Sequence, residues 1–250
     1  MEIFALIPAR AGSKSVPNKN LVLLSGYPLI AYSILAAKKC KYIKRIIVST
    51  DSEKIAQVAR QFGAEVPFLR PVEISNDDSK DIDFVLHAID WFEKNERILP
   101  DCFVHLRPTT PLRLPEIMNT AIKNFMESSD AESLRSAHPA PESPYKWFLL
   151  SQKIWFKAIR ENDSNDFINS PRQEFPIVYV PNGYIDILKT SVVKKRKVLY
   201  GEKMLAFISP FCCEVDSPEN LEYLEFEISK KGSILLSYLS QDFMSNVNLL

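Results

Sequence analysis

The chain opens with the sequence IFALIPARAGSKSVPNKN at positions 3–20, where a short apolar run leads directly into a loop rich in positive charge. Residues 3–7 have the length and composition of a buried parallel strand, and Pro8 ends it. In open α/β sheets, ligands bind at the edge where such strands end. This stretch therefore predicts both the sheet and the place of a binding site.

The loop after this strand combines cations with a glycine. Arg10, Lys14 and Lys19 can neutralise several negative charges and are the candidate catalytic residues. Gly12 lets the backbone approach a ligand closely, and Ser13 and the loop N–H groups can donate hydrogen bonds to phosphate oxygens. We expect a triphosphate to bind here; the alternative is an ordinary solvated basic turn.

Common nucleotide-binding patterns do not occur in the sequence. It contains neither G-x-G-x-x-G nor G-x-x-x-x-G-K-[ST], and it has only 6 glycines. A generic dinucleotide-binding or ATPase assignment therefore has no support.

Composition predicts one domain with a sizeable core, since 46% of the 250 residues are hydrophobic. The 31 basic and 31 acidic residues cancel, so no overall field favours nucleic acid or an anionic membrane, and we expect neither as a partner. Four cysteines, at positions 40, 102, 212 and 213, lack metal-ligand spacing, and the adjacent pair is typical of packing at a strand or its end. With no signal-like start and no apolar stretch near the roughly 18 residues of a membrane span, these features predict a reducing, cytoplasmic location.

Segments typical of strands and helices alternate along the chain, which predicts an α/β fold with a mostly parallel sheet flanked by helices. A single domain is expected over 1–250, with an excursion from the sheet at about 136–175, where Pro, Ser, Asn and charge accumulate. The strand ends are expected to converge on one edge. The expected strands are 3–7, 45–49, 102–106, 177–180 and 182–187, and the expected helices are 29–39 with Pro28 as first helical residue, 51–60 and 82–92.

Several motifs match one family in order along the chain. The opening stretch fits I-P-A-R-x-G-S-K-x-x-P-x-K-N, and G-x-P-L-I at 26–30, S-T-D-S at 49–52, R-P-x-x-x-x-x-D-D at 70–78 and P-T-x-P-L-R at 108–113 follow it. These motifs resemble those of the CMP-sialic acid synthetases, a family of cytidylyltransferases. The resemblance, which covers roughly residues 1 to 225, implies a Rossmann-like nucleotidyltransferase that joins CTP to a sialic acid or another nonulosonic acid and releases pyrophosphate.

The resemblance also implies a nucleotide site. Arg70 and Asn20 occupy the positions that line the cytosine pocket, and cytosine offers O2 and N3 as acceptors for an arginine. The alternative for Arg70 is a surface arginine before a turn-forming proline. The implied nucleotide-binding residues are Ala9, Gly12, Ser13, Asn20, Ser49, Asp51 and Arg70.

In the resembled family, the excursion is a dimerisation element that reaches over the neighbouring subunit's site with basic residues aimed at the sugar acid. By motif position these are Lys146 and Arg172, and an arginine offers a bidentate fork to a carboxylate. Ordinary exposed charges are the alternative. We expect a homodimer, and the candidate acceptor-binding residues are Arg107, Thr109, Lys146, Arg172 and Asp186.

A metal site is implied near the C-terminal end. Glu214-Val-Asp216, followed by Ser217, resembles the family's D-x-D-T-x-x-D-L motif. If residues 214–216 form a strand, Glu214 and Asp216 point the same way and can hold one Mg²⁺. The alternative is a helix cap at Asp216 or Ser217.

The sequence departs from the family pattern at three positions. Arg107 replaces a glutamine, Asp186 replaces an aromatic residue, and Val180 replaces a basic residue. Arg107 and Asp186 stand where the family contacts the acceptor, so they predict either a different acceptor or an ion pair that reshapes the pocket. The Val180 change is expected to weaken phosphate or acceptor binding.

Nucleophilic catalysis by a triad is not expected, because the three histidines have ordinary explanations: His87 on the apolar side of a helix, His105 in a strand and His138 before a proline. Positioning, Mg²⁺ and fixed cations suit a phosphoryl-type transfer. Two rival functions remain open: a CMP-Kdo-type synthetase for another 3-deoxy-ulosonic acid, and a catalytically silent nucleotide-binding regulatory protein.

Overall fold

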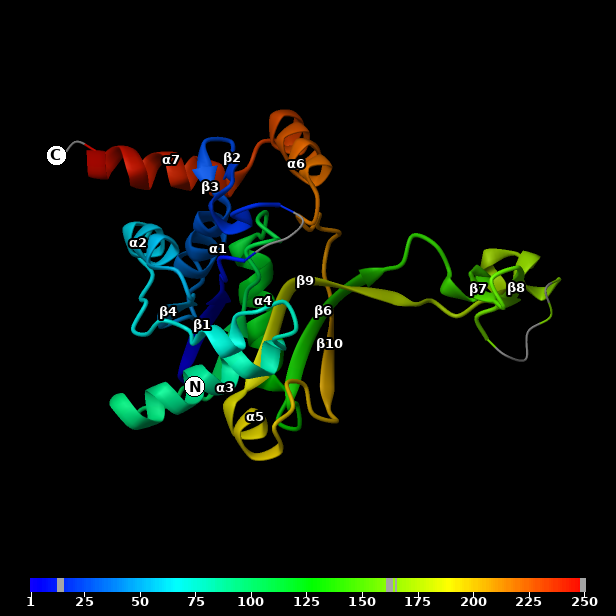
Figure 1. Cartoon of the computed structure of the whole chain (residues 1–250), viewed down its shortest axis with the longest axis horizontal. Helices are drawn as coiled ribbons and strands as arrows, with labels where there is room; N and C mark the ends of the chain where they lie inside the picture. The colour runs from blue at the N-terminus through cyan, green and yellow to red at the C-terminus, as the bar shows by residue number, and fades with distance from the viewer. Residues whose placement is uncertain (13–15, 161–163, 165, 248–250) are drawn as a thin grey trace.

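A computed structural model describes residues 1–12, 16–160, 164 and 166–247. Its centre is a six-stranded sheet in the order β10-β6-β9-β5-β1-β4 (Figure 1). β9 runs antiparallel to both of its neighbours, whereas the β1–β4, β1–β5 and β6–β10 pairs are parallel. The strands are β1 Ile3–Pro8, β4 Arg45–Ser49, β5 Cys102–His105, β6 Ser133–Pro139, β9 Tyr179–Lys189 and β10 Met204–Ile208.

β1 is buried on both faces because helices cover the sheet from both sides. Its alternate residues divide between two cores: Ile3 and Ile7 face one, and Phe4 and Leu6 face the other. The first core is closed by α1 Leu29–Lys38, α2 Glu53–Gln61, α4 Pro115–Glu127, α6 Pro218–Lys231 and α7 Ile234–Val247, and the second by α3 Asp81–Asn95 and α5 Thr190–Arg196. The predicted mostly parallel α/β architecture is confirmed. In the described part of the chain, no helix is long and apolar enough to cross a membrane.

Local sequence signals set the helix ends, with one correction. Ser52 caps α2, and its hydroxyl accepts a hydrogen bond from Ile55 N at 3.4 Å. Pro28, expected as the first residue of α1, is instead its N-cap, with ψ at 140°. It also pairs with Leu23 in the two-stranded ribbon of β2 Leu23–Leu24 and β3 Tyr27–Pro28, and this extended backbone delays the helix by one residue.

An arm leaves the sheet between β6 and β9. The two strands stay paired out to Pro139 and Tyr179, beyond a register shift at Arg135 and Ala137. The chain then forms a small tip that contains the hairpin of β7 Phe148–Ser151 and β8 Trp155–Ala158. Figure 1 shows this tip projecting well away from the body. The sequence placed its excursion at about 136–175, whereas the part of the arm beyond the paired strands runs from 140 to 178.

The segment before α6 differs from expectation. The metal-site prediction assumes a strand at residues 214–216, and the structure shows irregular chain there, because β10 ends at Ile208 and Pro210 cannot donate to a sheet ladder. Val215 N instead donates to Thr109 O at 2.7 Å, so the segment follows the loop after β5. Cys212 and Cys213 also lie on this irregular stretch as partly buried free thiols.

Candidate functional site

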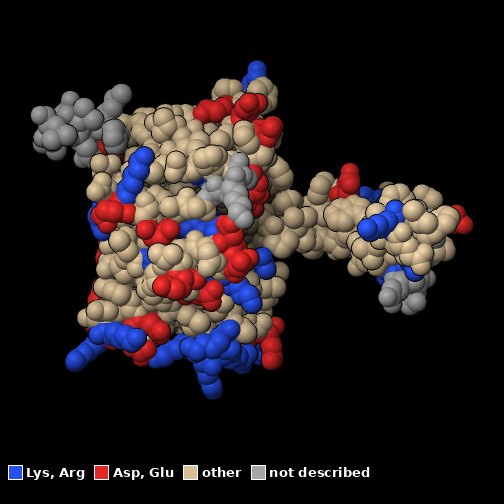
Figure 2. Space-filling view, viewed as in Figure 1, with Lys and Arg blue, Asp and Glu red and all other residues tan. Residues whose placement is uncertain are grey.

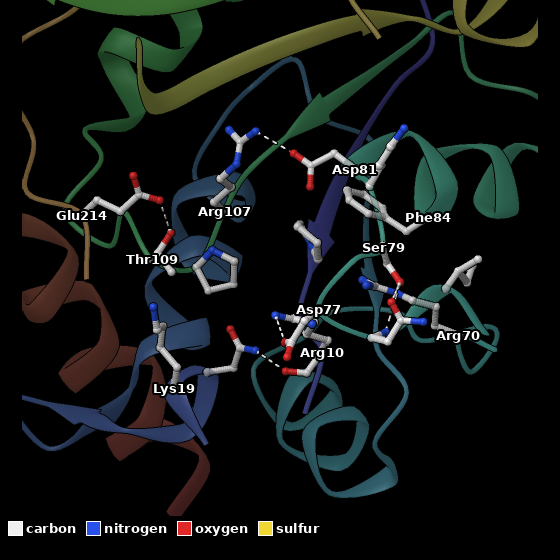
Figure 3. Close-up of a pocket in the computed structure, with 16 residues that line it drawn as sticks. Arg10, Lys19, Arg70, Asp77, Ser79, Asp81, Phe84, Arg107, Thr109 and Glu214 are labelled. Atoms are coloured by element: carbon white, nitrogen blue, oxygen red, sulfur yellow. Dashed lines mark hydrogen bonds and ion pairs between the residues drawn. The ribbon is translucent and has the colours of Figure 1, made fainter. Parts of the chain in front are cut away.

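A cavity of about 330 Å³ lies where β1 and β5 end. Arg10 reaches it from the loop after β1, and Arg107 and Thr109 reach it from the loop after β5 (Figure 3). The segment from Arg70 to Phe84 closes the opposite side. The convergence of strand ends thus brings seven of the candidate residues to one cavity: Arg10, Lys19, Asn20, Arg70, Arg107, Thr109 and Glu214.

Two of the predicted nucleotide-binding residues shape the opening loop. Asn20 Nδ2 donates to Arg10 O at 2.9 Å, and Asp51 Oδ1 accepts from Ala11 N at 2.8 Å. Ala9 N donates to Ser49 O at 2.9 Å, which continues the β1–β4 pairing. The described residues at the start of the loop, Ala9 to Ala11, are therefore held from both sides. Predicted residues Ser13 and Lys14 lie outside the described residues.

The described cations of the opening segment are paired with carboxylates. Arg10 Nη2 lies 2.8 Å from Asp77 Oδ1, and Lys19 Nζ lies 3.2 Å from Asp216 Oδ1. Both cations line the cavity. A polyanionic ligand must compete with these two carboxylates for the same cations.

Arg70 is buried and lines the cavity, so the alternative of a surface arginine is wrong. Its Nε and Nη2 donate to Ser49 Oγ at 3.0 Å and Ser49 O at 2.7 Å. Its guanidinium also lies 4.9 Å from the centre of the Phe84 ring. Burial lowers the pKa of Arg70 to about 10, which leaves it charged at neutral pH. Arg70 thus presents a fixed cation to the cavity wall.

Arg107 joins two carboxylates, and the ion pair expected with Asp186 is present. Arg107 Nη1 lies 3.0 Å from Asp186 Oδ2, and Nη2 lies 2.8 Å from Asp81 Oδ2. Tyr200 donates its hydroxyl to the same Asp186 oxygen at 3.0 Å. Only 1% of the Asp186 side chain is exposed, and it does not line the cavity. Asp186 therefore stands behind Arg107 rather than at the cavity surface.

The two predicted metal ligands do not act together in this structure. Glu214 lines the cavity and accepts a hydrogen bond from Thr109 Oγ1 at 2.8 Å, while Asp216 pairs with Lys19. The N-cap of α6 is Ser217, whose N–H donates to Asn220 Oδ1 at 2.9 Å, so Asp216 is not the cap. Among the described residues, no group of three or more His, Cys, Asp or Glu side chains is placed to hold a metal.

Lys146 and Arg172 lie on the arm, not in the cavity of the same chain. Arg172 Nη2 donates to Ala140 O at 2.9 Å, and Lys146 Nζ lies 5.6 Å from the centre of the Phe175 ring. Within one chain, the structure therefore separates these two cations from the other candidate acceptor residues.

Sequence reasoning missed residues whose importance is purely tertiary. Asp81 and Tyr200 meet Arg107 and Asp186 only after folding, although Asp81 adjoins the recognised 70–78 motif. Arg113, the last residue of P-T-x-P-L-R, is fully buried and donates to the backbone oxygens of four residues and to one hydroxyl: Arg107 O, Thr110 O, Gly183 O, Tyr184 O and Ser33 Oγ. Gly183, at φ +61°, leaves room for this loop, because a Cβ there would lie 3.3 Å from Thr110 Oγ1.

The histidines nearest the site do not form a catalytic pair. Burial lowers the pKa of His105 to about 4 and also lowers the pKa of His87, so both are neutral at pH 7. His105 packs edge-on against Phe84, with ring centres 5.3 Å apart. Charge at the cavity therefore comes from its arginines, lysines and carboxylates.

Comparison with known proteins identifies the family and the fold. A "CMP-N,N'-diacetyllegionaminic acid synthase" of Legionella pneumophila is 37% identical over 81% of this chain and 84% of its own length. A "pseudaminic acid cytidylyltransferase" of Campylobacter jejuni is 36% identical over 89% of this chain and 94% of its own. The solved structure of a CMP:2-keto-3-deoxy-manno-octonic acid synthetase complexed with CTP shares the fold, with a TM-score of 0.68 at 17% identity over 92% of this chain and all of that one. A family model described as cytidylyltransferase matches residues 4–225 and confirms the resemblance read from the sequence: the chain belongs to the cytidylyltransferase family.

Proposed function

We propose that this enzyme transfers CMP from CTP to a nonulosonic sugar acid of the sialic acid type and releases pyrophosphate. The observation that carries the proposal is the cavity, which combines Arg10 and Lys19 at its phosphate end with the buried cation Arg70 and with Arg107. The names of the two relatives support a nonulosonic acid as the acceptor class.

In the proposed reaction, the anomeric hydroxyl oxygen forms a bond to the α-phosphorus of CTP and loses its proton to solvent. The bond between that phosphorus and the oxygen bridging to the β-phosphate breaks, and pyrophosphate leaves. Arg10 and Lys19 would hold the phosphates in line, and Lys14 is assigned the same role from the sequence. Arg70 and Asn20 would bind the cytosine. Positioning, Mg²⁺ and fixed cations together supply most of the barrier reduction in such transfers.

Mg²⁺ is the proposed cofactor, and the residues present fit it. Glu214, Asp216 and the Thr109 hydroxyl provide the hard oxygen atoms that Mg²⁺ prefers. Mg²⁺ is commonly held by one or two carboxylates together with substrate phosphates, so a complete protein cluster is not required. When bound, the ion would neutralise charge that develops on the phosphates.

We further propose that the enzyme acts as a homodimer in which the arm of one subunit covers the cavity of the other. The arm exposes large apolar side chains, with Trp155 and Phe156 each 63% exposed at the tip. Ile177 is 75% exposed on the stem, the part of the arm between the sheet and the tip. In Figure 2 the stem shows almost no charged side chains. Apolar surface of this extent is typical of an interaction site, and the arm would bring Lys146 and Arg172 to a neighbouring cavity.

The dimer is tested by light scattering on the wild type and on Trp155→Asp with Phe156→Asp. We expect a dimer that dissociates in the double variant, whereas a wild-type monomer would refute the assembly.

The four cysteines are free thiols, which supports a reducing compartment and the proposed cytoplasmic location.

The function is tested by measuring pyrophosphate release from CTP and Mg²⁺ with a panel of sugar acids. Release with nonulosonic acids supports the proposal, and release with Kdo alone identifies the rival CMP-Kdo-type synthetase. CTP binding without release for any acid identifies a silent nucleotide-binding protein. CTP should also bind well ahead of UTP, because a site that pairs with the 4-amino group is left with an unpaired buried group when oxygen replaces it. Equal affinities in calorimetry would contradict the cytidylyl assignment.

A further inference from the structure

Four side chains form a continuous polar network that runs from the wall of the cavity into the interior. Asp81, the first residue of α3, binds Arg107, which binds Asp186, which in turn accepts the Tyr200 hydroxyl. Exposure falls along this network, from 41% for the Asp81 side chain to 23% for Arg107 and 1% for Asp186. Asp81 is therefore the carboxylate that this polar network presents to a substrate.

Asp81, Arg107 and Asp186 together carry one net negative charge, whereas Arg70 and Lys80, which also line the cavity, are positive. Asp81 and Asp186 contribute two negative charges and Arg107 one positive charge, and His105 adds none because burial lowers its pKa to about 4. The Asp81 carboxylate itself repels a phosphate or a sugar carboxylate that comes close to it. It favours a neutral part of a substrate that carries hydrogen-bond donors.

Asp81 has an acceptor available for such a donor. Its Oδ2 accepts from Arg107 at 2.8 Å, and no other described residue donates a hydrogen bond to the carboxylate. In Figure 3 its second oxygen, Oδ1, turns away from Arg107 toward the cavity. Because Asp186 and Tyr200 fix Arg107 from behind, this oxygen has a defined position.

We propose that Asp81 is a specificity-determining residue whose Oδ1 accepts a hydrogen bond from an N–H group of a substrate. The inference rests on the proposed function. Two substrates offer such a group: cytosine through its 4-amino group, since Arg70 and Asp81 line the same cavity, and the acceptor through an acylamino N–H, since Arg107 holds Asp81 directly. Uracil places an oxygen opposite the carboxylate in the first case, and an acid with only hydroxyl groups loses the N–H in the second.

The test uses Asp81→Asn and Asp81→Ala in the full chain. In Asp81→Asn the amide oxygen stays with Arg107, so its NH₂ faces the cavity and the acceptor becomes a donor. The control is Asp90→Asn, which removes an exposed carboxylate from the same helix far along its length. Thermal unfolding confirms that each variant folds, and Asp81→Ala serves if Asp81→Asn does not.

Two ratios are measured: CTP to UTP affinity by calorimetry without acceptor, and kcat/KM for an acylamino sugar acid relative to Kdo. A fall of at least tenfold in the first ratio assigns the N–H to cytosine, and a similar fall in the second alone assigns it to the acceptor. If neither ratio changes more than twofold, the inference is overturned while the proposed function stands. If the wild type binds no CTP, the proposed function fails and the inference fails with it.

Discussion

Lys19 Nζ and Asp216 Oδ1 lie 3.2 Å apart, so a residue assigned to phosphate and a residue assigned to Mg²⁺ neutralise each other. Neither can serve its proposed partner fully while the pair persists. A triphosphate that takes Lys19 releases Asp216, whose side chain is already 71% exposed. Nucleotide binding and metal binding are therefore expected to be coupled.

Asp216→Asn separates these two effects. In EDTA, the variant should bind CTP at least as tightly as the wild type, because Lys19 no longer has a competing carboxylate. In the full reaction it should need more Mg²⁺ for half-maximal rate, because a metal ligand is lost. Calorimetry in EDTA and a Mg²⁺ titration of pyrophosphate release check both expectations. A normal Mg²⁺ requirement would show that Asp216 forms the ion pair with Lys19 but does not bind the metal.

Arg10→Ala and Lys19→Ala should each reduce turnover by at least about tenfold and leave the fold intact. Partly exposed cations contribute little to stability, whereas cations beside a charged transition state contribute a few kcal/mol. Lys54→Ala, an exposed substitution on α2, is the matched control. Unchanged turnover in both site variants would show that the opening loop is an ordinary basic turn.

Asp77→Asn should strengthen CTP binding in EDTA by up to about fivefold. Asp77 lies 2.8 Å from Arg10 Nη2, and the two side chains are 38% and 33% exposed, so the pair is worth at most about 1 kcal/mol. Removing the carboxylate makes Arg10 more available to a phosphate. Asp78→Asn, an exposed neighbour, is the control in the same calorimetric titration. Weaker binding in Asp77→Asn would show that Asp77 orients Arg10 rather than competing for it.

Arg107 and Asp186 should behave as one unit. Arg107→Gln leaves Asp186 buried without its cation, which should cost about 3 kcal/mol of unfolding free energy, whereas Arg107→Gln with Asp186→Tyr should cost less than the sum of the single changes. The double variant restores the pattern common in sialic acid enzymes, so kcat/KM for N-acetylneuraminate should rise relative to the native acceptor. Denaturant unfolding and the ratio for two sugar acids, measured in all four proteins, decide it. Additive costs with an unchanged ratio would exclude both residues from acceptor selection.

The sequence predicted those features that local pattern controls. Strands β1, β4 and β5 follow from short apolar runs, and the loops at their ends follow from the turn residues beyond them. It did not predict the conformation of residues 214–216, because alternation in so short a segment cannot show that Val215 would bond to Thr109 instead of a strand.

The polar network of Asp81, Arg107, Asp186 and Tyr200 was only partly predictable. The pairing of Arg107 with Asp186 followed from two departures from a family motif, since charges of opposite sign replaced neutral residues at both positions. Tyr200 had no such signal, because it reaches Asp186 from a loop outside every motif. The burial of Arg70 was equally hidden, since it depends on Ser49 and Phe84 packing around it.

Arg113 has a consequence for how such an enzyme can change. The loop from Arg107 to Arg113 takes its shape from one buried guanidinium, which gathers the backbone oxygens of Arg107, Thr110 and Gly183. The side chains of Arg107 and Thr109, which face the cavity, contribute no part of that framework. Arg113 thus sets the backbone conformation of the loop, whereas the side chains of other residues make the contacts in the cavity. A lineage that keeps Arg113 can exchange residue 109 by a single substitution, and residue 107 together with its partner at position 186, and so explore new acceptors on a backbone that is already set.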